Sequence, residues 1–409
     1  MQRAYRIISA DSHLDLAPDR WTHRVPAKWR DRAPRRVQLE NGADAVVIEN
    51  RAMHQLTFAR MGGLASGEAH KQTPTFETHA GSGSPEHRLR EQDQDGVDAE
   101  ILFTHSAHTS FWRGIREDEG YRALIHAYNE FLAEEYCAHA PDRLLAMGVI
   151  PPTCLADALA ELEYCAEAGF RGVALYRFPS GKGYPTAEDD RFWAAALERR
   201  MPITSHTNGG STRFTHEGPA FLYPHPPPDT GGALSRDPIS VELFRFCGDA
   251  AFAPIQLAFA GVFDRFPELQ IYWAETQVGW LPFALWQIDD HCERYLPLVQ
   301  ERWGLSSLER RPSEYLRSQN LWGFLYDAVG VRLRHDTGAG ALLWGSDFAH
   351  AASNWPRSQQ IIDEMFAGVP DDERHMMVAG NAIRFFHLDQ EGNGGPDARR
   401  HGPPGHTRA

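Results

Sequence analysis

The chain has 409 residues, of which 42% are hydrophobic and 23% charged, a composition typical of a globular enzyme. Its formal net charge of −14 disfavours nucleic acid as a partner and suits an acidic site for a cation. Because it contains no run of about 18 apolar residues and no apolar leader, we expect neither a membrane span nor a signal peptide. Five scattered cysteines indicate a reducing cytoplasm, without disulfides or a cysteine-bound metal.

The first apolar run, residues 5–9, predicts a short buried strand that leads into Asp11 and His13. Residues two apart on a strand point to the same face, so this carboxylate and this imidazole can meet at one point, as two ligands of a metal ion do. A single Asp-x-His sequence is common by chance, so the pair needs support from the rest of the chain.

Residues 14–85 are predicted to form a long insertion after this strand. It begins with a stretch rich in Arg, Pro and Trp, continues as a β-hairpin over 37–48 around Asn41-Gly42, and ends in a Gly- and Ser-rich loop over 61–85. Long loops in compact domains are often functional, so this insertion is expected to shape the pocket.

From residue 86 onward, strand-like and helix-like segments alternate, which is typical of a parallel sheet. The predicted strands are 99–105, 143–150, 172–177, 201–206, 269–275, 321–326 and 341–347. The predicted helices are 86–95, 117–140, 155–168, 190–200, 239–266, 281–295, 327–335, 357–367 and 371–386. Eight strands in order favour a closed (βα)8 barrel over an open sheet.

We therefore predict the α/β class: one (βα)8 TIM barrel domain over residues 1–388, with loop insertions at 14–85 and 207–238. The second insertion is rich in Gly and Pro, which favours a flexible loop. Residues 389–409 lack apolar periodicity and are predicted to be a disordered tail.

Three later strands each end in a side chain that can bind a metal or carry a proton: His206, Glu275 and Asp347. Active sites of (βα)8 barrels lie at the carboxyl ends of the strands. Each residue alone has a purely structural alternative, because the histidine could be held by a backbone carbonyl, the aspartate could cap a helix and the glutamate could pair with a cation. Their joint placement favours a site.

Several stretches resemble the amidohydrolase superfamily, in the branch that includes aminocarboxymuconate-semialdehyde decarboxylase and the resorcylate-type decarboxylases. The most specific are Leu-Trp-Gly-Ser-Asp-Phe-Ala-His at 343–350 and Gly-Asn-Ala-Ile-Arg-Phe-Phe at 380–386. Residues 8–13, 144–151, 168–173 and 266–271 also match. The tail and the two insertions are not covered by the resemblance.

The resemblance implies one divalent metal ion held by Asp11, His13, His206 and Asp347. Two histidines with two carboxylates suit Zn²⁺ first, with Mn²⁺ and Fe²⁺ as alternatives. The chain departs from the family at one ligand position and one catalytic position: Asp11 stands where His or Glu is common, and Glu275 stands where a catalytic His is common. No lysine that could bridge a second ion is present in the fourth strand.

Two reactions follow from this site. The first is hydrolysis, with Asp347 as general base for a metal-activated water and Glu275 as the proton carrier on the leaving-group side. The second is non-oxidative decarboxylation. We expect a hydrolase first, because Glu275 stands in place of the catalytic His at the end of strand 269–275. A barrel that only binds a ligand is the last of the three alternatives. Arg177 and His350 are predicted to contact a small-molecule substrate, with support of a metal ligand as the alternative role for His350, and a homodimer is considered.

Overall fold

The computed structural model describes most of the chain, in nine ranges: residues 3–49, 51–53, 73–77, 80–104, 106–182, 184–206, 250–304, 307–350 and 352–389. The predicted insertion at 207–238 lies outside these ranges, as do residues 390–409 of the predicted tail. The single-domain boundary at residue 388 stays a prediction.

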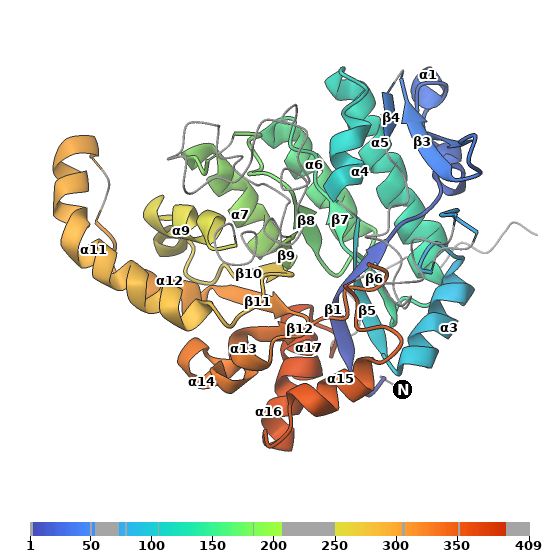
Figure 1. Cartoon of the computed structure of the whole chain (residues 1–409). Helices are drawn as coiled ribbons and strands as arrows, with labels where there is room; N and C mark the ends of the chain where they lie inside the picture. The colour runs from blue at the N-terminus through green and yellow to red at the C-terminus, as the bar shows by residue number, and fades with distance from the viewer. Residues whose placement is uncertain are drawn as a thin grey trace, which may run out of the picture.

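The described residues form a barrel of parallel strands (Figure 1). One sheet has the order β1-β5-β6 and the other the order β12-β11-β10-β9-β8-β7. The strand bounds are β1 Ile8–Leu14, β5 Ala99–Thr104, β6 Leu144–Ala146, β7 Gly148–Val149, β8 Val173–Leu175, β9 Ile203–His206, β10 Ile271–Ala274, β11 Asn320–Phe324 and β12 Leu342–Trp344. The predicted α/β barrel is confirmed.

Two seams join these sheets into a ring. At the first, β6 and β7 are the two halves of the predicted third strand, separated by Met147, and each half pairs with a different neighbour. At the second, the backbone N–H of His13 donates to the carbonyl of Phe348 at 2.5 Å, and that of Asp347 donates to the carbonyl of Asp11 at 2.9 Å. The first and last strands of the barrel therefore meet directly beside the predicted metal ligands.

The strands are buried on both faces, as parallel sheets covered by helices require. Every residue of β1, β5 and β11 is buried. The surrounding helices are α3 Pro85–Asp95, α4 Ser106–Trp112, α5 Asp118–Phe131, α6 Leu155–Glu167, α7 Asp190–Glu198, α9 Phe252–Phe259, α10 Val262–Arg265, α11 Leu281–Trp303, α12 Pro312–Ser318, α13 Ala328–Arg332, α14 Arg334–Thr337, α15 Ser358–Met365, α16 Asp371–His375 and α17 Asn381–Phe385. No helix of the described ranges has the length and apolar surface needed to span a bilayer.

Several predicted elements have different bounds in the structure, and two of these differences are large or lie at the site. The first strand is β1 (Ile8–Leu14), so Asp11 and His13 lie inside it and not beyond its end. The helix predicted over 281–295 continues to Trp303, where Gly304 ends it with a left-handed φ of 65°, and α11 projects from the barrel (Figure 1).

The predicted hairpin at 37–48 is present and gains a third strand. Within the first predicted insertion, β2 (Arg35–Gln38), β3 (Asp44–Ile48) and β4 (Arg51–Met53) pair antiparallel in that order. A short helix, α1 (Ala27–Arg30), precedes this sheet and buries Trp29. This insertion is thus partly a small sheet beside the barrel.

Candidate metal centre

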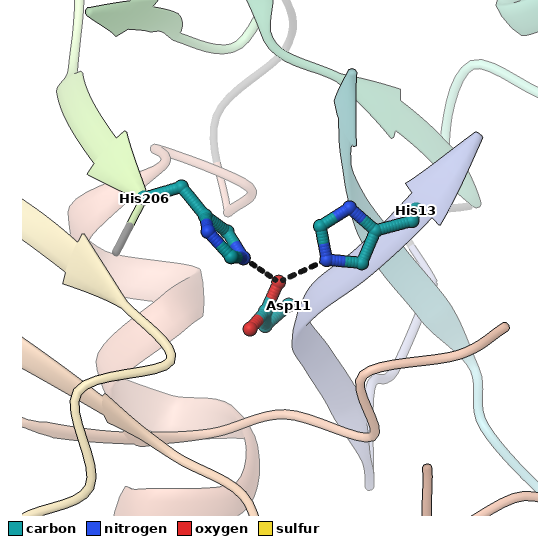
Figure 2. Close-up of side chains that lie close together, drawn as sticks. All are labelled: Asp11, His13 and His206. Atoms are coloured by element: carbon teal, nitrogen blue, oxygen red, sulfur yellow. Dashed lines mark ion pairs between the residues drawn. The ribbon is translucent and has the colours of Figure 1, made fainter. Parts of the chain in front are cut away.

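The four predicted metal ligands converge at one end of the barrel. Figure 2 shows the Asp11 carboxylate between the imidazoles of His13 and His206. Its Oδ1 lies 3.5 Å from Nε2 of His13 and 3.4 Å from Nε2 of His206. The same nitrogen of His13 lies 3.2 Å from Oδ1 of Asp347. All four side chains are buried, so the cluster is held in an environment of low dielectric constant.

A bulge in β1 aims the first two ligands. The pairing of β1 with β5 shifts register between Ser9 and Ser12, the interval that contains Asp11. Bulges bend a strand and redirect its side chains, and they are common next to active sites. Both Asp11 and His13 can therefore reach the same point in space, although the strand is irregular where they lie.

Three buried serine hydroxyls connect β1 to the segment after β12. The Ser9 hydroxyl lies 2.9 Å from that of Ser12 and 3.0 Å from that of Ser346, and the backbone N–H of Ser346 donates to it at 2.8 Å. Sequence reasoning missed this contact, although Ser346 is part of the motif at 343–350. The serines fix the distance between the two segments that supply three of the four ligands.

Glu275 and Asp347 share an uncommon backbone conformation. Each follows a barrel strand, and each has a φ of 55°, in the left-handed region that few non-glycine residues adopt. Such conformations cost about 1–3 kcal/mol and cluster at functional sites. Glu275 is buried with its Oε2 3.5 Å from Nε2 of His206, so the structure brings this residue into the cluster as well.

His350 joins the cluster through Asp347. Its Nδ1 lies 2.6 Å from Oδ1 of Asp347, and its ring stacks on that of His13 with centroids 4.0 Å apart. An ionised carboxylate only accepts hydrogen bonds, so Nδ1 of His350 carries the proton of this bond. Burial opposes the charged form of His350, but Asp347 outweighs it, and the pKa of His350 lies above its ordinary value.

The chemistry of these groups fits a divalent cation. Both carboxylate oxygens of Asp11 are buried and accept no hydrogen bond from a described residue. Burial lowers the pKa of His13 well below its ordinary value, which favours the neutral form that binds metals. One possible ligand atom from each of Asp11, His13 and His206 lies within 4.8 Å of the others. Two carboxylates with two imidazoles suit Zn²⁺, Mn²⁺ or Fe²⁺.

Arg177, predicted to contact substrate, is placed differently from the other residues. It follows β8 (Val173–Leu175) by two positions, and its side chain is exposed. The structure therefore brings His350 and Glu275, but not Arg177, into the buried cluster.

Gly345 allows β1 to approach the end of β12. A Cβ atom at this position would lie 2.6 Å from the Cβ of Asp11, closer than real side chains come. We expect Gly345→Ala to displace Asp11, to cost about 1–3 kcal/mol of stability and to weaken cation binding. Gly340→Ala is the matched control, because nothing lies within 4 Å of its Cβ position. Chemical denaturation and Mn²⁺ titration of both variants check this, and equal results would contradict it.

A barrel with metal-binding side chains at the rim defines a class of metal-dependent enzymes. The amidohydrolase family model matches residues 19–388, and the chain belongs to this family. The chain resembles the decarboxylase orsB of Emericella nidulans, with 29% identity over 198 residues, which is 48% of this chain and 54% of that protein. It spans about half the length of the first curated relatives that it matches.

Two solved structures have the same fold. The amidohydrolase map2389c of Mycobacterium avium subsp. paratuberculosis has a TM-score of 0.69 at 17% identity, covering 94% of this chain and 100% of that chain. The 5-carboxyvanillate decarboxylase of Novosphingobium aromaticivorans, solved with bound manganese, has a TM-score of 0.63 at 17% identity, covering 94% and 97%. At this identity the likeness shows the barrel fold alone.

Proposed function

We propose that this protein is a metal-dependent, non-oxidative decarboxylase that acts on a small organic acid. The buried cluster of two carboxylates and two imidazoles at the rim of the barrel carries the proposal. The choice of reaction is supported by three curated relatives that are decarboxylases: orsB, gamma-resorcylate decarboxylase and 2-amino-3-carboxymuconate-6-semialdehyde decarboxylase. Hydrolysis, the reaction expected first from the sequence, has no such support.

Asp11, His13, His206 and Asp347 would hold the cation. When bound, a divalent cation supplies a Lewis acid that holds a substrate carboxylate and neighbouring oxygen atoms. The ligand chemistry suits Zn²⁺, Mn²⁺ or Fe²⁺, and a structural neighbour contains manganese. His350 fixes the orientation of Asp347 through the 2.6 Å hydrogen bond.

Decarboxylation of this kind breaks the bond between a carbon atom and its carboxylate, releases CO₂ and leaves the electron pair on that carbon. The carbon must then take a proton, so the site needs a group that delivers one. Glu275 is a buried carboxyl group within the cluster, and we assign it this proton delivery. Arg177 and His350 remain the proposed substrate contacts, and a homodimer remains a proposal.

Hydrolysis stays a second candidate because of one residue. Glu275 directly follows β10, at the position where the resemblance implies a catalytic histidine. A carboxyl group there can also give a proton to a leaving group after attack by water. The two reactions differ in whether water oxygen enters the product.

Isotope labelling separates the two reactions. Protein loaded with Mn²⁺ or Zn²⁺ is incubated with hydroxylated benzoic acids, amides and lactones in D₂O and, separately, in H₂¹⁸O. We expect CO₂ release from an aromatic acid, with one deuterium on the carbon that lost its carboxylate. Incorporation of ¹⁸O into the product without CO₂ would replace this proposal with hydrolysis.

A further inference from the structure

Arg88 is a fully buried cation in α3 (Pro85–Asp95), with a relative exposure of 0%. Its guanidinium donates to both carboxylate oxygens of Glu100 on β5, at 2.6 and 3.0 Å. Gln92, one turn further along α3, donates to the same carboxylate at 2.7 Å. The buried charge of Arg88 is thus paired in the bidentate geometry that an arginine and a carboxylate favour.

The remaining donors of Arg88 reach the seam where the barrel closes. Nη1 donates to the carbonyl of His13 at 3.0 Å, and Nη2 donates to the carbonyl of Phe348 at 3.3 Å. His13 is itself a proposed metal ligand, and Phe348 directly follows Asp347, another proposed ligand. One side chain therefore connects two ligand-bearing segments that are more than 300 residues apart in sequence.

The guanidinium also lies over an aromatic ring of the same seam. It is 4.4 Å from the ring centroid of Phe348, and the Phe348 ring also stacks on that of Trp355 with centroids 4.9 Å apart. This packing holds the segment after β12 against α3. Lysine could replace the charge of Arg88 but not its planar set of donors, which serves Glu100 and two carbonyls together.

We propose that Arg88 is a positioning residue of the metal centre: anchored by Glu100, it fixes the spacing between His13 and Asp347 and so sets the affinity for the divalent cation. The proposal rests on the metal centre of the proposed function but not on the reaction. Partners of metal ligands that act in this way are worth 10–100-fold in metal affinity.

Arg88→Lys tests this inference, with Arg265→Lys as the matched control. Two nitrogens of Arg265 likewise donate to the carboxylate of Asp190, at 2.7 and 2.8 Å, and a third donates to a backbone carbonyl. Arg265 lies on the outer helices. The metal-free proteins are titrated with Mn²⁺, and their Co²⁺ forms are compared by visible absorption, which reports ligand geometry. Melting temperatures of the metal-free forms are measured alongside.

We expect Arg88→Lys to weaken Mn²⁺ binding about 10–100-fold and to change the Co²⁺ spectrum, while Arg265→Lys changes neither. Glu100→Gln, which weakens the anchor of Arg88, is the second variant and should shift affinity in the same direction. A lower melting temperature with unchanged affinity and spectrum would overturn the inference and make Arg88 merely structural. Absence of cation binding by the wild-type protein would instead overturn the proposed metal centre.

Discussion

Replacing His206 by alanine should give a folded protein that has lost its divalent cation and its activity. His206 is the last residue of β9, and its Nε2 lies 3.4 Å from Oδ1 of Asp11 and 3.5 Å from Oε2 of Glu275. Removing the imidazole takes one of four ligands and leaves two buried carboxylates facing each other. Elemental analysis should find about one ion per wild-type chain and almost none in the variant.

His335→Ala is the control for this experiment. His335 lies 3.5 Å from Oε2 of Glu373, a spacing like that of His206 and Glu275, but its side chain is 65% exposed. The His335→Ala variant should keep the wild-type metal content and activity. A folded, metal-free wild-type protein with full activity would contradict the assignment of all four ligands.

The convergence of Asp11, His13, His206 and Asp347 could be predicted from the sequence because each of them is tied to a strand. Residues two apart on a strand share a face, which places Asp11 and His13 on the same side. The parallel strands of a barrel all have their carboxyl ends at one rim. His206 and Asp347 follow buried apolar runs that are readable without a structure. The predicted end of the first strand was wrong, since β1 extends past Asp11 and His13 to Leu14, and the metal-binding role of the four residues stays a prediction.

The supports of the ligands could not be predicted, because they depend on contacts across the whole chain. The helix that carries Arg88 reads as a polar, solvent-facing segment, yet Arg88, Glu91, Gln92 and Asp95 are all buried in it. Their partners lie on β5, in the seam beside β1 and β12, and at the start of α15. Hydrophobic periodicity reports which face is apolar and carries no signal for a buried polar network.

The metal ligands alone do not determine the reaction, which depends on the groups around them. A cluster of two carboxylates and two imidazoles serves hydrolysis and decarboxylation alike, so the ligands do not decide between them. The group that moves a proton decides, and the proposed group is Glu275, the residue after β10, which departs from the family pattern. A test of Glu275 is therefore a test of mechanism.

Glu275→Gln should lower kcat about 10²–10⁴-fold while the metal content stays at the wild-type level. Glutamine keeps the size and hydrogen bonding of the side chain but has no titrating proton to deliver to the carbon that loses CO₂. The carboxyl group lies 3.5 Å from His206, within the cluster but without a ligand role in the proposed centre. CO₂ release, elemental analysis and the melting temperature are measured on this one variant.

Glu135→Gln is the matched control, because Glu135 also contacts a histidine, His23 at 3.0 Å, on the outside of the barrel. The three measurements on Glu275→Gln separate three roles. Loss of metal together with activity would make Glu275 a further ligand, and a lower melting temperature with unchanged kcat would make it structural. A folded, metal-loaded variant with wild-type kcat would remove Glu275 from the mechanism, and the proton would then have to reach the carbon from another group of the cluster.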